Sequence, residues 1–456
     1  MASSPTPEHA TRAFERLIRD AQAEARLPSV SAATFRGGEL LWQRALGVAD
    51  AEAGEEATPE HQYAIASITK SFVAAAVLQL RDEAKLDLED PLGRHLPDVP
   101  HGTLTLRTML AHTSGLQREP PGEIWETLKA PSREELLLGL GDAEQVLPPN
   151  VEWHYSNLAY SLLGEVVARV SGIEFGRFLE QRLLEPLGLT GTSWAPSRPV
   201  RPYYVEPYSD VVSLEAGLEL GGTDAAGGLW STTADLARWG GFLADPDPAI
   251  LSPASARQMR SVQAIIDDAW TSGHGLGLQL WRRGERVFAG HTGGLPGFAS
   301  IVAWLPREQA GAVILASSGS WPALIETGLK LAEAVEDELP AVKEEWRPGA
   351  EPPEDVVSLL GRWWSEGSEF VFSWRDRLEA RPADVPTVLE PAVFEREGDD
   401  AWRTVSGRER GELLRVVRGD DGRVSKLYWA TYPFTRDPQS FAAGRPTPVE
   451  EAPVET

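Results

Sequence analysis

Two residues in the stretch YAIASITKSF, residues 63–72, have the types and the spacing of a nucleophile and its base. Ser67 and Lys70 are three positions apart, so in a helix they lie on one face with Cβ atoms roughly 5–6 Å apart. A serine hydroxyl needs a base within hydrogen-bond distance, and a lysine among apolar residues loses its proton more easily. The alternative is a serine at a helix start with a lysine that reaches solvent, since this short pattern often occurs by chance.

Two further motifs follow the serine–lysine pair along the chain. Residues 155–157, Tyr-Ser-Asn, stand directly before a helical pattern, and alone they are also typical of a turn with a helix N-cap. Residues 291–293, His-Thr-Gly, end a predicted strand, and alone they also fit a strand that ends in a glycine turn. The three motifs lie in a consistent order, at a helix start, in a loop and on a strand, and together they indicate a catalytic site.

Helical and β-rich segments that would position these motifs can be recognised from periodicity. The segment 67–83 lacks Gly and Pro and is rich in Ala, Leu and Val, which predicts a buried helix. Residues 157–171 have apolar side chains at helical spacing, and Gly172 is typical of a helix end. A hairpin is expected around Arg36–Glu39, an antiparallel meander from about residue 274, and a further helix in PALIETGLKLAEAVEDEL.

Composition changes after this region. Residues 340–356 are rich in Pro and Glu and predict a linker between a first domain, 1–339, and a second one. Residues 357–443 contain many tryptophans and short alternating segments separated by turns such as GDDG, which predict a small β-barrel. Residues 444–456 are expected to form a disordered tail.

Charge and composition exclude several classes of protein. The chain has 456 residues and a net charge of −25, which argues against binding to nucleic acid or to an anionic membrane surface. It has no cysteine, no histidine pair at i, i+4 and no carboxylates at metal-ligand spacing, so we expect neither a metal nor another cofactor. Neither a signal peptide nor a run of about 18 apolar residues is visible, so a cytoplasmic protein without a membrane span is expected.

The three motifs together resemble those of the serine β-lactamase and penicillin-binding-protein superfamily, in the branch with class C β-lactamases, DD-peptidases, D-aminopeptidases and esterases. That family has Ser-x-x-Lys, Tyr-x-Asn and Lys-Thr-Gly or His-x-Gly motifs, and the likeness extends over about residues 10 to 335. LTLRTMLAHTSGL and AAGGLWSTTADLARW are further stretches of this kind. The resemblance implies an α+β fold with about five antiparallel strands flanked by helices, an inserted helical region and a C-terminal lipocalin-like barrel.

The resemblance also implies roles for individual residues. Ser67 would be the acylated nucleophile, Lys70 would take or share its proton, and Tyr155 would act as the base or relay the proton to the leaving group. Which of Lys70 and Tyr155 is the base stays open. Asn157 would orient Lys70 and donate to the acyl side of the substrate. The other expected substrate-binding and oxyanion-binding residues lie on the predicted strand, where His291 would line the pocket from the sheet edge: His291, Thr292, Gly293 and Gly294.

His291 departs from the lysine that most β-lactamases have at this position. A mostly neutral histidine forms no charge-assisted contact with a substrate carboxylate, a loss of roughly 1.5–3 kcal/mol. We therefore expect a serine hydrolase of small esters or amides. D-amino-acid peptidase, transacylase or DD-carboxypeptidase-like activity and weak β-lactamase activity are alternatives within the enzyme class. A catalytically silent binding or scaffold protein is the alternative of another class, and the oligomeric state stays open.

Overall fold

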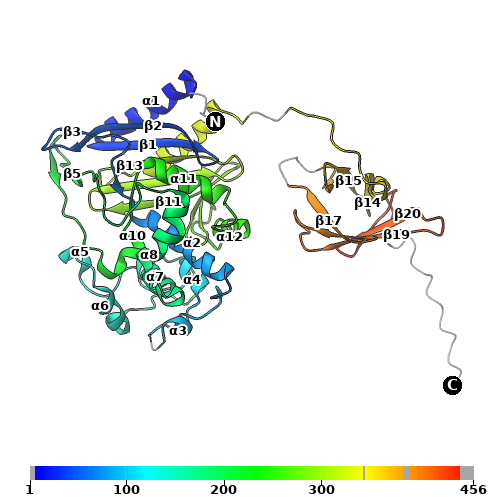
Figure 1. Cartoon of the computed structure of the whole chain (residues 1–456), viewed down its shortest axis with the longest axis horizontal. Coiled ribbons are helices and arrows are strands. Elements are labelled where there is room, and N and C mark those ends of the chain that lie inside the picture. The colour runs from blue at the N-terminus through cyan, green and yellow to red at the C-terminus, as the bar shows by residue number, and fades with distance from the viewer. Residues whose placement is uncertain (1–5, 98, 342–344, 385–389, 442–456) are drawn as a thin grey trace. The chain divides into compact units, whose positions relative to one another are not determined.

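The computed structural model describes residues 6–97, 99–341, 345–384 and 390–441 (Figure 1). The chain divides into two compact units, residues 1–342 and 343–456. The predicted disordered tail, residues 444–456, lies outside the described residues. The two units are described separately below.

A nine-stranded antiparallel sheet, in the order β3-β2-β1-β13-β12-β11-β10-β9-β8, is the centre of the first unit. Its size corrects the expectation of about five strands. The shortest members, β3, β8 and β9, have only two or three residues each, too few to show a two-residue periodicity. The strands are β1 Ser29–Arg36, β2 Glu39–Asp50, β3 Glu55–Glu56, β8 Ala264–Ile265, β9 Ser272–His274, β10 Gln279–Arg283, β11 Arg286–Leu295, β12 Phe298–Leu305 and β13 Ala310–Ala316.

The hairpin predicted near the N-terminus is confirmed. Strand β1 ends at Arg36 and β2 begins at Glu39, so two glycines form the turn. Gly37 and Gly38 have φ of 55° and 79°, the left-handed region that glycine adopts without steric cost.

Both faces of the long central strands are buried, because alternate side chains point into two different cores. In β13, Ala312 and Ile314 contribute to the core under α1 and α13, whereas Val313 and Leu315 contribute to the core on the other face. Helices α1 Glu8–Glu24 and α13 Leu324–Glu338 cover the first face, and α11 Thr233–Ala244 packs on the second (Figure 1). The helix predicted after the meander is thus confirmed as α13.

A helical region is inserted between the N-terminal and C-terminal strands of the sheet. Helix α2 is buried from Thr69 to Leu80, as predicted for a helix that is apolar nearly all round. Helix α7 has Ser156 as its N-cap and ends at Gly172, whose φ is 71°, as predicted. The elements are η1 Ala66–Ile68, α2 Thr69–Asp82, α3 Leu92–His95, α4 Leu106–Leu110, α5 Ile124–Thr127, α6 Arg133–Leu138, η2 Gly139–Asp142, α7 Asn157–Ser171, α8 Phe175–Leu179, η3 Glu180–Leu184, α9 Glu185–Leu187, η4 Gly221–Thr223, α10 Asp224–Gly227, α11 and α12 Pro253–Met259.

Two small strand pairs complete the first unit. They are β4 Tyr63–Ala64 with β7 Trp230–Ser231, and β5 Tyr203–Val205 with β6 Val212–Leu214. Within the described ranges, none of the helices has the length and apolar composition needed to cross a membrane.

The second unit is a nearly closed barrel of eight antiparallel strands, which confirms the predicted all-β domain. The first and last strands meet where Trp364 and Thr435 exchange backbone hydrogen bonds of 2.8 and 2.9 Å. Helix α14 Glu354–Val357 belongs to this unit, since its Val356 packs in the barrel core. The strands are β14 Gly361–Ser365, β15 Ser368–Trp374, β16 Leu378–Pro382, β17 Ala392–Gly398, β18 Ala401–Thr404, β19 Leu413–Arg418, β20 Val424–Trp429 and β21 Tyr432–Phe434.

Candidate active site

Ser67 lies in the short helix η1, directly before the buried helix α2. Its side chain is half-buried, and the preceding residue, Ala66, has a φ of 48°. Alanine rarely adopts this left-handed conformation, which persists only where the surrounding structure enforces it. Here Ile65 donates a backbone hydrogen bond of 3.0 Å to Leu229, on the segment that follows α10. The tertiary structure therefore holds the backbone of Ser67 in a fixed, strained turn.

Lys70 is 0% exposed and lies one helical turn after Ser67. Its Nζ is 3.0 Å from Ser67 Oγ and donates a 2.6 Å hydrogen bond to the carbonyl oxygen of Ala226. Burial places the pKa of Lys70 well below its usual value, although the nearby Glu119 carboxylate acts in the opposite direction. A neutral amine at this position can accept the proton of the Ser67 hydroxyl.

Tyr155 approaches the same hydroxyl from the loop before α7. Its side chain forms a hydrogen bond with Ser67, and burial raises its pKa above the usual value although that bond opposes the shift. The Nζ of Lys70 lies 5.0 Å from the centroid of the Tyr155 ring. The His112 ring stacks on Tyr155 with centroids 4.3 Å apart, which fixes the plane of the phenol. The Tyr155 side chain that contacts Ser67 is therefore a protonated phenol and not a phenolate.

Asn157 lies at the start of α7, where its amide contacts Glu119. The hydrogen bonds of Lys70 go to Ser67 and Ala226 instead. Asn157 Nδ2 donates a 2.7 Å hydrogen bond to Glu119 Oε1, and its buried Oδ1 has no hydrogen-bond partner. Burial raises the pKa of Glu119, while the bond from Asn157 lowers it. Glu119 is not predicted from the sequence, because a single carboxylate in a loop has no periodicity or spacing that would reveal it.

Strand β11 supplies the opposite side of the site. A Cβ added at Gly293 would overlap the carbonyl oxygen of Ile65, so only glycine permits this approach of the strand to η1. Ser300, on the neighbouring strand, donates a 2.9 Å hydrogen bond to the same carbonyl. Thr292 is held through hydrogen bonds of its N–H and hydroxyl to Gln279 Oε1, 3.1 and 3.0 Å long. Gly294 is exposed next to Ser67.

Strand β11 as a whole does not lie at the edge of the sheet, since β10 and β12 flank it. Its pairing with β10 ends at Gly290, however, so from His291 onward β11 is paired only with β12. The side chain of His291 is 0% exposed, and its Nδ1 is 2.6 Å from the carbonyl oxygen of Thr292. Burial places its pKa well below the usual value. His291 is therefore a neutral group behind the surface of the site.

Three buried histidines lie behind Lys70 and Tyr155. The ring centroids of His112 and His274 are 4.7 Å apart, and those of His274 and His291 are 6.2 Å apart. Each has an Nε2 without a hydrogen-bond partner, and burial lowers the pKa of each, that of His274 to about 4. His112 Nδ1 accepts a 3.0 Å hydrogen bond from the N–H of Ser156 and so holds the loop that carries Tyr155. Among the described residues, no group of metal-ligating side chains is arranged to hold an ion.

A cavity of about 120 Å³ opens at Ser67. A second cavity of about 680 Å³ shares Trp125, Gly294 and Leu295 with it. Neither includes His291, Thr292 or Gly293. The residues that line the smaller cavity are Ala66, Ser67, Arg118, Glu119, Ile124, Trp125, Asn157, Leu218, Leu220, Thr223, Ala226, Gly227, Gly294 and Leu295.

The geometry around Ser67 can be compared with known families. A family model described as "Beta-lactamase" matches residues 14–336, more than half of the chain. The chain belongs to the beta-lactamase family. A second model, described as a domain of unknown function (DUF7586), matches residues 352–436, which contain the barrel. The resemblance inferred from the three motifs is thus confirmed for the family and for the fold.

Relatives of this chain include proteins that share about a quarter of its residues over the matched region. Protein flp of Staphylococcus aureus (strain N315) is 26% identical over 326 residues, which are 69% of this chain and 64% of that protein. The chain therefore spans less than two thirds of the length of this curated relative.

Solved structures show the same fold. The structure titled "Crystal structure of SurE" is 25% identical and covers 94% of this chain and 98% of its own, with a TM-score of 0.59. D-amino acid amidase from Ochrobactrum anthropi SV3, complexed with L-phenylalanine amide, is 26% identical and covers 72% of this chain and 99% of its own, with a TM-score of 0.63. These similarities place the chain in the β-lactamase and penicillin-binding-protein superfamily.

Proposed function

We propose that this protein hydrolyses esters or amides of small molecules through an acyl-enzyme formed on Ser67. One observation carries the proposal. A fully buried lysine lies 3.0 Å from the hydroxyl of Ser67, at the wall of a cavity, and the hydroxyl of Tyr155 contacts the same serine. A nucleophile with a base at hydrogen-bond distance is the arrangement that acyl transfer requires.

Lys70 is the base in this proposal. Burial lowers the pKa of Lys70 and so favours the neutral amine, which accepts the proton of Ser67 as Oγ attacks the carbonyl carbon. Tyr155 keeps its proton during the attack, because its pKa is raised rather than lowered. It then passes this proton to the leaving alcohol or amine and is reprotonated with the proton that Lys70 accepted from Ser67. Water then cleaves the acyl–Ser67 ester, which releases the acid and restores the serine. The choice between Lys70 and Tyr155 thus rests on opposite effects of burial on an amine and a phenol.

Two backbone N–H groups are proposed to hold the oxyanion. Ser67 lies at the N-terminal end of η1 and α2, and Gly294 faces the same cavity from β11. The N–H of Ser67 and that of Gly294 would together stabilise the tetrahedral intermediate, and loss of one such donor costs roughly 3–4 kcal/mol. The close approach at Gly293 is what brings the strand to this position.

The charges around the cavity support uncharged ester or amide substrates. His291 is buried and neutral, so it offers no cation to a substrate carboxylate. Arg118 lines the cavity, but its Nε lies 3.6 Å from Glu119 Oε1, which offsets its charge. A β-lactam or a peptide with a free carboxylate therefore gains less here than at a site with an unpaired lysine.

The test compares wild type with Ser67→Ala on p-nitrophenyl acetate and butyrate, with nitrocefin in parallel. We expect ester turnover that the variant loses, with little nitrocefin cleavage. Fast nitrocefin turnover would identify a β-lactamase instead. A Ser67→Ala protein that keeps its turnover, or a wild type that binds these compounds without turning them over, would contradict the proposal.

A second candidate is hydrolysis of D-aminoacyl amides or peptides. Glu119 lines the cavity beside Ser67, and a carboxylate there can bind the ammonium group of an aminoacyl substrate. A similar solved structure is that of a D-amino acid amidase. D- and L-phenylalaninamide should be compared with wild type, Glu119→Gln and the exposed control Glu126→Gln. A preference for the D-amide that is lost only in Glu119→Gln would favour this candidate over simple esters.

A further inference from the structure

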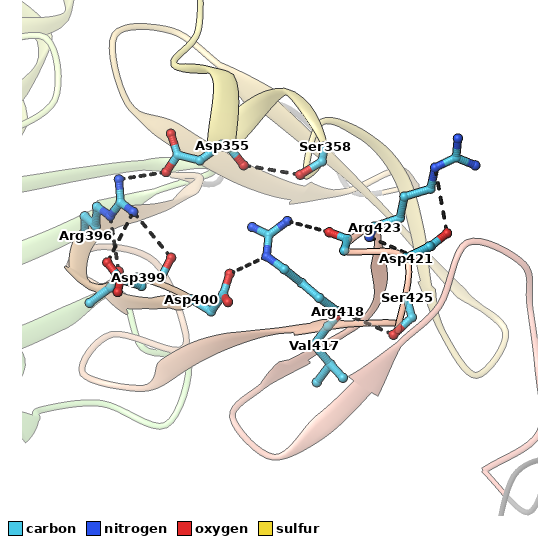
Figure 2. Close-up of polar contacts among 12 residues, drawn as sticks. Asp355, Ser358, Arg396, Asp399, Asp400, Val417, Arg418, Asp421, Arg423 and Ser425 are labelled. Atoms are coloured by element: carbon cyan, nitrogen blue, oxygen red, sulfur yellow. Dashed lines mark hydrogen bonds and ion pairs between the residues drawn. The ribbon is translucent and has the colours of Figure 1, made fainter.

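The barrel of the second unit has one filled end. Val356 and Leu359, in and after helix α14, are 0% and 1% exposed and pack with Trp363 in the barrel core. Arg396 Nη1 lies 2.8 Å from Asp355 Oδ2, an ion pair that joins α14 to the end of β17 (Figure 2). This side of the interior is therefore occupied by the barrel's own side chains. A cavity of about 800 Å³ at this end is bordered by exposed and half-buried residues around α14 and not by the barrel core.

Charged side chains surround that filled end. Figure 2 shows Arg418 paired with Asp400 and Arg423 paired with Asp421. The Arg418–Asp400 pair joins the end of β19 to the turn before β18, with Nε 2.9 Å from Oδ1. Each of these three arginines thus has a carboxylate partner, which offsets its charge.

The opposite end of the barrel is hollow. In an antiparallel barrel the end of β14, the end of β16 and the start of β17 lie together, away from α14. A cavity of about 740 Å³ opens there, within the range of small-molecule sites. It is lined by Ser365, Glu366, Ser368, Phe370, Ala380, Arg381, Pro382, Glu390, Ala392, Gly407, Arg408, Glu409, Trp429, Ala430, Tyr432, Phe434 and Phe441.

Side-chain size explains why this end is hollow. Ala380 on β16 and Ala392 on β17 point inward, are 2% and 6% exposed, and leave space where larger side chains would fill it. Trp363 and Phe372 occupy the corresponding interior toward α14. An interior of eight strands is just wide enough either to be filled by side chains or to hold one small ligand. Small residues at one end therefore create a site within an otherwise packed barrel.

The cavity wall includes five aromatic side chains, and charged and hydroxyl side chains line it as well. The Phe370 ring meets those of Trp429 and Phe434 edge to face, with centroids 6.0 and 5.2 Å apart. Trp429 Nε1 already donates a 2.9 Å hydrogen bond to Thr404, so it presents only its ring to a ligand. Arg408 is 94% exposed and paired with Glu409 at the rim. The wall thus suits an uncharged hydrocarbon or aromatic group, with any polar end of the ligand directed to solvent.

We propose that the open end of the barrel binds one small, predominantly apolar molecule with an aromatic or branched hydrocarbon group. This site is independent of the proposed hydrolysis at Ser67. It contains no nucleophile paired with a base, so it binds its ligand without transforming it. The chain's own residues after Phe441 are the competing occupant, because Phe441 itself lines the cavity.

The test measures fluorescence of N-phenyl-1-naphthylamine, a neutral apolar probe, with the full-length protein. We expect saturable enhancement at one probe per chain. Ala392→Phe and Ala380→Phe, which fill the cavity from two different strands, should each weaken binding at least tenfold. Ala383→Phe, at an exposed position just after β16, is the matched control and should stay within twofold of wild type.

Each alternative result has a defined meaning. Absence of saturable binding, or equal binding by the two filling variants and the control, would overturn the proposal. Binding that appears only after the chain is shortened to end at Phe441 would also overturn it, since the chain itself would then be the occupant. If one filling variant fails to unfold cooperatively, the other decides. Ester turnover at saturating probe should be unchanged, and inhibition would place the probe at the first unit instead.

Discussion

The site at Ser67 and the cavity in the barrel differ in size and in polarity. The first is a space of about 120 Å³ whose polar lining includes the hydroxyl of Ser67, the amide of Asn157 and the carboxylate of Glu119, whereas the second is about 740 Å³ and includes several aromatic side chains. Acyl transfer requires polar groups within about 3 Å of one carbonyl, which a narrow site provides. Binding of an apolar molecule requires removal of surface from water, which a wide hydrophobic cavity provides. The first unit therefore has the features that acyl transfer requires, and the second has those that binding of an apolar molecule requires.

Removal of the proposed base should produce the largest difference between the two units. We expect Lys70→Met to lower kcat/KM for p-nitrophenyl butyrate about 10²- to 10⁴-fold, because Ser67 loses the group that accepts its proton. Probe binding by the barrel should not change. Lys330→Met, on the exposed side of α13, is the control and should keep wild-type turnover.

The pH dependence tests the same assignment. Because the pKa of Lys70 is lowered, turnover should be low where the amine is protonated and rise with pH until it is neutral. A Lys70→Met protein within tenfold of wild type, or a rate that falls as pH rises through this range, would contradict Lys70 as the base.

The glycine contact between β11 and η1 should have the next largest effect. Gly293→Ala forces a Cβ onto the carbonyl oxygen of Ile65, so we expect a loss of 1–3 kcal/mol in the stability of the first unit, by analogy with other overpacked sites. Gly294→Ala is the matched control for unfolding, since its Cβ would meet no atom within 4 Å. Thermal unfolding distinguishes the two variants. Equal unfolding midpoints for Gly293→Ala and Gly294→Ala would show that β11 can shift away from Ile65 without loss of stability.

Acid should destabilise the first unit through its buried histidines. The pKa of His274 is about 4 in the folded chain against an ordinary 6.5, so the unfolded chain binds a proton that the folded chain does not. The contribution of neutral His274 to the free energy of unfolding is fully present above pH 6.5. It falls as the pH approaches 4, by at most about 3 kcal/mol. His274→Gln should reduce the slope between these values, whereas the exposed His9→Gln should not. The free energy of unfolding in urea is measured at pH 7 and at pH 5. An equal loss of stability between these pH values in wild type and in His274→Gln would contradict the assignment to His274.

The smallest effect is expected at the filled end of the barrel. Asp355→Asn removes the partner of Arg396, a partly exposed pair worth roughly 0.2–1 kcal/mol. Asp399→Asn, at a fully exposed carboxylate, should change stability less still. Unfolding of the barrel should shift by no more than a few degrees, with probe binding retained. Loss of probe binding in Asp355→Asn alone would show that the two ends of the barrel are coupled.

The sequence by itself determined the motifs and the elements that carry them. The spacing of Ser67 and Lys70, the N-cap before α7 and the β-rich pattern after residue 274 depend on neighbours in the chain, so periodicity reveals them. The tryptophan-rich alternation after residue 357 likewise indicated an all-β unit. Short strands such as β8 and β9 are not predicted from the sequence, because their pairing depends on the neighbouring strand and not on their own residues.

Tertiary structure alone decided what surrounds the serine and what fills the barrel. Glu119 joins Asn157 across 38 positions of sequence, and His291 is fully buried in the packed unit, so neither fact is visible in local spacing. The ionisation of Lys70 and Tyr155 depends on burial, which is a property of the whole packed unit. The hollow end of the barrel depends on where Ala380 and Ala392 meet after the sheet closes. Sequence fixes which groups are present, but only folding sets their distances and their exclusion from water.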